Sequence, residues 1–143
     1  MKLNIGSGKT KLEGYVNWDI MDGNSAYPLT VEDGVIEEVY ASHILEHFGH
    51  REVVPVLKDW FRAMAPGGRI RVAVPDLTKI MNEFDTGDRE MTEMYLMGGQ
   101  TNDHDIHHSV WIRSKLIAAL QTAGFENVDD WSDDGPHDCS RLP

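Results

Sequence analysis

The chain has 143 residues, the size of one domain, and its 41% hydrophobic and 26% charged residues are ordinary for a soluble globular protein. A single cysteine, Cys139, rules out an internal disulfide and a metal site made of several thiolates. The net charge of -11 argues against nucleic-acid substrates, whose binding depends on clustered Lys and Arg. No apolar run approaches the roughly 18 residues of a membrane helix, and no signal peptide precedes the first strand. We expect one cytoplasmic domain over residues 1–143 that binds neither nucleic acid nor a membrane.

Strand patterns alternate with helix patterns along the chain. Runs of β-branched and apolar residues predict strands at residues 3–5, 15–19, 35–41, 69–74 and 125–131. Apolar residues at helical spacing predict helices at residues 51–64, 77–84, 89–97 and 112–123. Pro66-Gly67-Gly68 is expected to end the first helix, and Gly124 to cap the last one. This alternation predicts an α/β fold with a mostly parallel sheet, in which ligands bind beyond the carboxyl ends of the strands.

Three sequence features lie at such strand ends and are expected to converge. They are Gly6-Ser7-Gly8 after the first strand, Asp19 at the end of the second, and Ala41-Ser42-His43 at the end of the third. A glycine turn lets backbone amides approach a carboxylate or phosphate of a ligand closely. An acid at the neighbouring strand end suits the two hydroxyls of a ribose. Together these features favour a cofactor that contains a nucleoside.

Two familiar nucleotide sites do not fit the spacing. Gly8-Lys9-Thr10 looks like the end of a phosphate-binding loop, but the leading glycine of that motif would fall on Leu3. A dinucleotide site has a third glycine and places its acid about 20 residues further on. Here only ten residues lie between Gly8 and Asp19, so a full crossover helix hardly fits between the first two strands.

The order of motifs provides a more specific indication. The segments LNIGSG, GYVNWDI, IEEVYASHILEHF, VLKDWFRAMAPGGRIRVAVPDL, GGQTNDHDIHHSVW and LIAALQTAGFENV together resemble the small class I S-adenosylmethionine-dependent methyltransferases, from about Leu3 to Val128. The resemblance implies a three-layer Rossmann-like methyltransferase fold, with the shortened first crossover of one subgroup. In that family a final strand usually follows the segment that resembles HDCSRLP, whereas this chain stops at Pro143. We therefore expect a sheet without its last strand, and a homodimer or partner contact at the C-terminal sheet edge.

The resemblance also implies S-adenosyl-L-methionine as the cofactor and methyl transfer as the reaction. By position, Gly6, Ser7 and Gly8 would wrap the methionine part, Asp19 would hold the ribose hydroxyls, Ile20 would pack on the adenine, and Ala41, Ser42 and His43 would border the methyl group. A general base is needed only where the acceptor must lose a proton, and the candidate catalytic residues are His43, Glu46 and His107. The acceptor, whether a small molecule, a glycan or a peptide, is not identified by the sequence.

Two other functions remain as alternatives. His43-Ile44-Leu45-Glu46-His47 fits the H-x-x-E-H pattern of one class of zinc peptidases, but it lies inside the methyltransferase-like series of motifs. A polar loop with His104, Asp105, His107 and His108 offers further metal ligands, yet it is more typical of a solvated lid. We therefore expect no metal site. The remaining alternative is a non-catalytic module that keeps the fold and binds the cofactor weakly or not at all.

Overall fold

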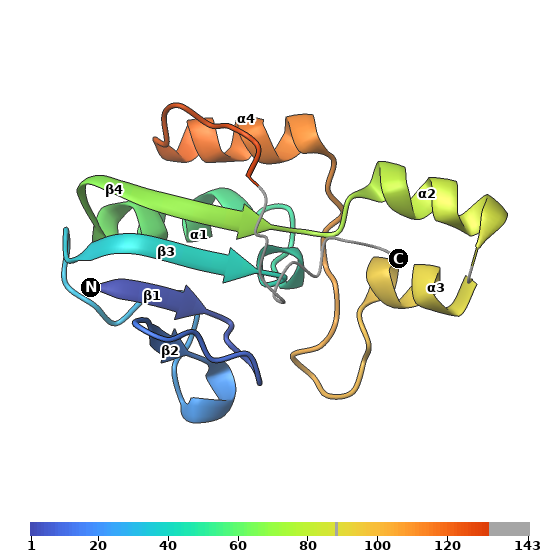
Figure 1. Cartoon of the computed structure of the whole chain (residues 1–143), viewed down its shortest axis with the longest axis horizontal. Helices are drawn as coiled ribbons and strands as arrows, with labels where there is room; N and C mark the ends of the chain where they lie inside the picture. The colour runs from blue at the N-terminus through green and yellow to red at the C-terminus, as the bar shows by residue number, and fades with distance from the viewer. Residues whose placement is uncertain (88, 132–143) are drawn as a thin grey trace.

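The computed structural model describes residues 1–87 and 89–131 (Figure 1). Within these residues the sheet has four strands, all parallel, in the spatial order β2-β1-β3-β4. The strands are β1 (Lys2–Ile5), β2 (Val16–Trp18), β3 (Ile36–Ser42) and β4 (Met64–Ala73). The helices are α1 (Val53–Ala63), α2 (Leu77–Thr86), α3 (Arg89–Met97) and α4 (Arg113–Ala123), with 3₁₀ turns η1 (Ile20–Asp22) and η2 (Leu45–His47). The predicted α/β fold with a parallel sheet is confirmed.

One face of the sheet forms the hydrophobic core, because alternate side chains of each strand point the same way. The register aligns Leu3 of β1 with Val39 of β3, and Val39 with Ile70 of β4. Helix α1 lies against this face and buries Trp60 completely, and the Trp60 indole Nε1 donates to the Ala26 carbonyl at 2.8 Å. Helix α4 packs beside α1, whereas α2 and α3 lie beyond the carboxyl end of β4 (Figure 1). That carboxyl edge is therefore flanked by helices and loops.

The opposite face of the sheet carries a charged cluster around Glu38. Glu38 accepts hydrogen bonds from the Tyr15 hydroxyl at 2.8 Å and from Arg69 at 3.0 Å. Arg71 and Lys2 lie 3.3 and 3.4 Å from its carboxylate. Burial disfavours the ionised form of Glu38, but these hydrogen bonds and positive charges outweigh that cost and hold its pKa below the usual value. The cluster thus links β1, β3, β4 and the residue that precedes β2.

A short loop, without a helix, connects β1 to β2. The Asn4 side chain donates to the Thr10 carbonyl at 3.0 Å and to the Asn17 side chain at 2.9 Å. The Asn17 side chain in turn accepts from the Leu12 amide at 2.9 Å. Two paired asparagines on neighbouring strands therefore hold the loop where a crossover helix would otherwise lie. The predicted shortened connection is confirmed.

The boundary between the first predicted helix and the next strand differs from the expectation. Helix α1 ends at Ala63, and β4 begins at the following residue, Met64. The segment Pro66-Gly67-Gly68 thus lies inside β4 and not in a separate turn. The register between β3 and β4 shifts between Ile36 and Glu38, and this irregularity accommodates the proline and glycines within the paired strand.

The prediction of a last strand at residues 125–131 is wrong: the structure describes all of these residues, and they form no strand. Asn127 has a left-handed backbone with φ of 53°, which interrupts an extended conformation. The segment instead follows α4 back toward β4, where the Trp131 indole Nε1 donates to the Val72 carbonyl at 3.0 Å. Residues 132–143, near which the sequence predicts a partner contact, lie outside the described residues.

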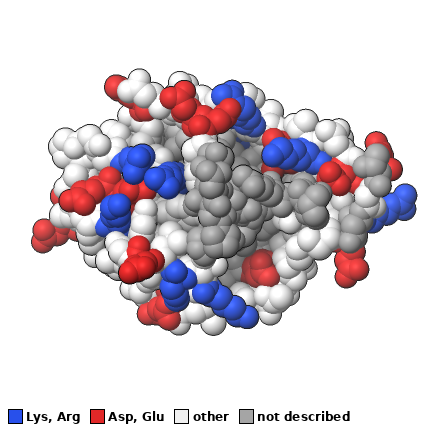
Figure 2. Space-filling view, in the orientation of Figure 1, with Lys and Arg blue, Asp and Glu red and all other residues white. Residues whose placement is uncertain are grey.

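Charged side chains of both signs are interspersed on the face shown in Figure 2. Basic and acidic groups also pair elsewhere in the described chain, as do Lys11 with Asp22 at 3.2 Å and Arg62 with Asp59 at 3.0 Å. Within residues 1–87 and 89–131, no helix has the length and apolar character that crossing a membrane requires.

Candidate functional site

The strand order creates a switch point at the carboxyl edge of the sheet. From β1 the chain moves to one side to form β2, and later returns to the other side of β1 to form β3. In parallel sheets of this type, the crevice at such a reversal is the usual ligand site. The residues that follow β1, β2 and β3 include the predicted site residues Gly6-Ser7-Gly8, Asp19 and His43. The fold therefore gathers them at one edge.

The glycine turn after β1 is shaped by close contacts on one side and open space on the other. Gly6 has φ of 67°, and a Cβ atom there would lie 2.7 Å from the Ile44 Cδ1 atom. Only glycine permits this approach between the first and third strand ends. Gly8 has φ of 47°, and a Cβ atom there would meet no other atom within 4 Å. The turn is thus packed at Gly6 and open to a ligand at Gly8.

Asp19 lies directly against this turn. One oxygen of its buried carboxylate accepts a hydrogen bond from the Gly8 amide at 2.7 Å, and the other accepts from the Met21 amide at 2.9 Å and so caps η1. A carboxylate offers about four lone-pair directions, so two remain for further donors. Ile20 follows with its side chain exposed. The structure therefore brings the predicted turn, acid and apolar residue together.

Three other residues expected at the cofactor have more interior positions. The Ser7 side chain is buried, and its hydroxyl accepts from Lys11 at 3.0 Å. Ala41 is aligned with Ile5 and Val72 in the sheet, and its side chain lies in the hydrophobic core. Ser42 has a buried hydroxyl that lacks a hydrogen-bond partner among the described residues. Of the three, Ser42 is the one with an unused polar group at the carboxyl edge.

His43 turns the chain sharply at the end of β3. It has φ of 55°, which is uncommon for a residue with a side chain, and its amide donates to the Ala73 carbonyl at 2.9 Å. This turn leads into η2, which carries Glu46 and His47. The His43 Nδ1 atom lies 3.2 Å from Glu46 Oε1. The unusual backbone therefore sets an imidazole next to a buried carboxylate.

A loop from a distant part of the chain completes this cluster. The amides of His108 and Ser109 both donate to the Glu46 carbonyl, at 2.8 and 3.2 Å. This places the His107 Nε2 atom 3.9 Å from Glu46 Oε1, and the His107 ring meets the His47 ring edge-on with 4.9 Å between centroids. Burial lowers the pKa of His107, although the nearby Glu46 carboxylate opposes that change. The three candidate catalytic residues are thus brought together, with His47 beside them.

The sequence did not single out the partnership of His47 with His107. The remaining polar residues of the same loop have other roles: Asp105 accepts from the Thr101 hydroxyl at 2.8 Å and so holds the loop, and the side chains of His104 and His108 are exposed. The four residues His104, Asp105, His107 and His108 therefore do not form one chelating cluster. The i, i+1 pair Glu46-His47 was the only local signal for the arrangement that does form.

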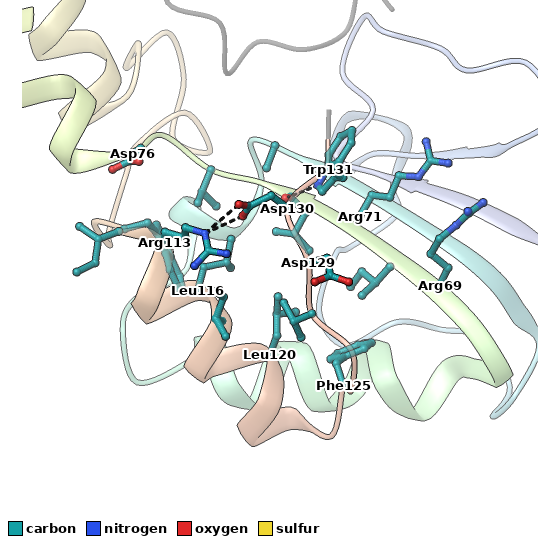
Figure 3. A pocket seen from close by; sticks show the side chains of 18 of the residues that line it. Arg69, Arg71, Asp76, Arg113, Leu116, Leu120, Phe125, Asp129, Asp130 and Trp131 are labelled. Carbon is teal, nitrogen blue, oxygen red and sulfur yellow. Dashed lines mark hydrogen bonds and ion pairs between the residues drawn. The ribbon is translucent and has the colours of Figure 1, made fainter. Parts of the chain in front are cut away.

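A groove that the glycine turn does not line lies between β4 and α4 (Figure 3). Leu116, Leu120 and Phe125 form its apolar floor, and Arg113 pairs with Asp130 at 2.8 Å at its rim. Among the described residues β4 pairs only with β3, so this groove follows the open edge of the sheet. It runs along the sheet edge and, at the carboxyl end of β4, reaches His43 of the candidate site.

No protein-family model and no curated protein matches this chain. Among solved structures it is similar to a SAM-dependent methyltransferase from Archaeoglobus fulgidus, with 20% identity and a TM-score of 0.56. The similarity covers 88% of this chain and 61% of that one, so the chain spans about three fifths of the solved protein's length. At this identity the comparison establishes the fold: the chain has the Rossmann-like fold of a methyltransferase.

Proposed function

We propose that this chain is an S-adenosylmethionine-dependent methyltransferase. The observation that carries the proposal is the 2.7 Å contact between the Gly8 amide and the Asp19 carboxylate, over the switch point of a parallel sheet. This contact joins two groups. One is a glycine turn that is open to a ligand, and the other is an acid whose carboxylate has unused lone pairs. The Archaeoglobus fulgidus protein of the same fold is described as SAM-dependent, which supports this cofactor.

The residues present fit the parts of this cofactor. The open side of the turn at Gly8 suits the methionine part, the Asp19 carboxylate suits the ribose hydroxyls, and the exposed Ile20 suits the adenine ring. The cofactor supplies an activated methyl group bonded to a sulfonium, so the protein mainly needs to orient the partners and exclude water. His43, next to Glu46, is the best-placed group to accept a proton from an acceptor.

Calorimetry with S-adenosylmethionine and S-adenosylhomocysteine tests the proposal. We expect the wild type to bind both ligands, and Asp19→Ala to bind them about 10- to 100-fold more weakly, because hydrogen bonds to a charged group contribute about 1.5–3 kcal/mol. The affinity of Asp19→Asn, which keeps one acceptor oxygen, should fall between those of the wild type and Asp19→Ala. The matched control is Asp22→Ala, which removes a more exposed carboxylate from the same 3₁₀ turn.

The outcomes separate the possible functions. Absence of binding by the wild type would refute the cofactor assignment, and equal binding by wild type and Asp19→Ala would refute the role of Asp19. Once binding is measured, small molecules, glycans and peptides can be screened as acceptors of a labelled methyl group. Binding without transfer to any of these would favour the non-catalytic module.

A further inference from the structure

We propose that Glu46, His47 and His107 form a binding site for a divalent transition-metal ion, with Zn²⁺ as the best match. One ligand atom from each residue lies within 4.8 Å of the others, and within residues 1–87 and 89–131 no other group of His, Cys, Asp or Glu has this arrangement. Methyl transfer from a sulfonium does not require these three side chains together. The site is therefore additional to the proposed cofactor site.

Hydrogen bonds orient both imidazoles for metal binding. The His47 Nδ1 atom lies 3.1 Å from the Ile106 carbonyl, and the His107 Nδ1 atom lies 2.9 Å from the Tyr95 carbonyl. Because a carbonyl only accepts hydrogen bonds, Nδ1 carries the proton in each ring, and a neutral ring then has its lone pair at Nε2. Metal-binding histidines are typically held in this way by a backbone carbonyl.

Glu46 supplies the negative charge and an unused oxygen. Its side chain is 1% exposed, and its Oε2 atom has no hydrogen-bond partner among the described residues. The other oxygen, Oε1, lies 3.2 Å from His43 and 3.9 Å from His107. A buried carboxylate is costly unless its oxygens are satisfied. A cation between Glu46 and the two rings would provide that missing interaction.

The donor set identifies the class of ion. Two imidazole nitrogens and one carboxylate oxygen match zinc sites in which three protein ligands leave a fourth position open. Imidazole ligands suit Zn²⁺ and its first-row neighbours, whereas Mg²⁺ and Ca²⁺ prefer oxygen ligands. In the H-x-x-E-H pattern, the two histidines would bind the ion and Glu46 would activate a water. Here the geometry instead groups Glu46 itself with His47 and the distant His107.

An ion in this position would join two segments that are far apart in the sequence. Turn η2 and the loop that contains His107 already meet through the amides of His108 and Ser109 on the Glu46 carbonyl. Binding to the folded state alone stabilises it in proportion to the logarithm of ion concentration over Kd. Metal binding should therefore raise the thermal midpoint of the chain.

Zinc titration of the chelator-treated full chain, in competition with a chromophoric chelator, tests the site. We expect one equivalent of Zn²⁺ to bind the wild type. Glu46→Gln and His107→Ala should each weaken zinc binding by more than about 100-fold, because mutating even the residues that only hydrogen-bond to metal ligands lowers metal affinity about 10- to 100-fold. The matched control is His104→Ala, which removes an exposed imidazole from the same loop and should leave the affinity unchanged. Zn²⁺ should raise the thermal midpoint of the wild type and of His104→Ala only.

A second measurement uses only the wild type, so it does not depend on whether the variants fold. In side-chain ¹⁵N spectra, zinc should shift the Nε2 resonances of His47 and His107 and leave that of His104 in place. The proposal is overturned if the wild type binds no zinc, if the folded Glu46→Gln and His107→Ala variants bind it as tightly as the wild type, or if the shifted resonances belong to other histidines. None of these readouts depends on the methyl donor, so failure here leaves the proposed function untouched.

Discussion

Gly6 and Gly8 lie two residues apart, with left-handed backbones of φ 67° and 47°, yet they meet different surroundings. At Gly6 a side chain would collide with Ile44, so Gly6→Ala should destabilise the fold itself. At Gly8 a methyl group would meet no protein atom within 4 Å and would project into open space. The two positions therefore separate a requirement of folding from a requirement of ligand binding.

We predict that Gly8→Ala lowers the free energy of unfolding by about 1–2 kcal/mol, the cost of a left-handed backbone for a residue with a Cβ atom. It should also weaken S-adenosylhomocysteine binding at least about tenfold. Gly34→Ala is the matched control, because Gly34 has φ of 70° and equally open surroundings but lies before β3, at the amino end of that strand. Urea unfolding and calorimetry of both variants are the measurements. Equal loss of affinity in the two variants would contradict a ligand at Gly8.

The residues of the candidate site differ in how far the sequence could predict their positions. The Gly8 amide and the Asp19 side chain are 11 residues apart and follow adjacent strands, so the strand pattern alone was enough to expect that they converge. His47 and Ile106, the carbonyl partner that orients its ring, are 59 residues apart. No local periodicity encodes which residue of a long loop meets η2. The Glu46, His47 and His107 cluster consequently became visible only in three dimensions.

At the scale of elements, the Glu38 cluster ties three strands together on the polar face of the sheet. Since the pKa of Glu38 in the fold lies below its usual value, its ionised form stabilises the fold above the unfolded pKa. This contribution is lost as the pH falls through the lower, folded pKa. The cluster thus makes the stability of the sheet sensitive to acid.

We predict that Glu38→Gln lowers the free energy of unfolding at pH 7 by about 1.5–3 kcal/mol, because the partly buried hydrogen bonds from Arg69 and Tyr15 lose their charged acceptor. Denaturant unfolding between pH 7 and pH 3 should show that the variant loses less stability toward acid than the wild type. Glu37→Gln, a change of the same type at an exposed neighbour on β3, is the control and should behave as the wild type. An acid dependence that is the same in Glu38→Gln and wild type would contradict this role of Glu38.

Helices were predicted more accurately than the outer strand. The helix expected at residues 89–97 has those bounds, and Gly124 caps α4 with a left-handed backbone, because apolar spacing and capping residues are local signals. The segment 125–131 has a strand-like composition, but Asn127 takes a left-handed conformation and the chain leaves the extended path. In β4, Pro66-Gly67-Gly68 falls at the register shift between β3 and β4, so the predicted turn becomes an irregularity within a continuing strand. Tertiary contacts decide the conformation of both segments, and such contacts cannot be read from the local pattern of a single sequence.

At the scale of the whole molecule, the edge of β4 is the most distinctive surface. Among the described residues β4 has a neighbour on one side only, and the groove beside it has an apolar floor (Figure 3). Unpaired strand edges invite pairing with another chain. The predicted homodimer through this edge remains a prediction.

We expect light scattering to show a dimer at micromolar concentration. Leu116→Glu, which adds a charge to the groove floor, should shift the mass toward the monomer. Thr122→Glu adds the same charge at an exposed position of α4 outside the groove and should leave the mass unchanged. A wild-type chain that is monomeric throughout this range would contradict the expectation.

The helix-free loop between β1 and β2 also bears on the order in which the molecule assembles. Asn4 and Asn17 pair across only 13 residues, whereas the pairing of β1 with β3 spans nearly three times that length, as for Leu3 and Val39. The entropy of closing a chain segment grows with the logarithm of its length, so the shorter closure is easier by about 1 kcal/mol. The same closure brings the Gly8 amide to the Asp19 carboxylate. The part of the proposed cofactor site made by Gly8 and Asp19 is therefore a local unit of low contact order. The Glu46, His47 and His107 cluster, in contrast, forms only when a loop about 60 residues away docks on η2.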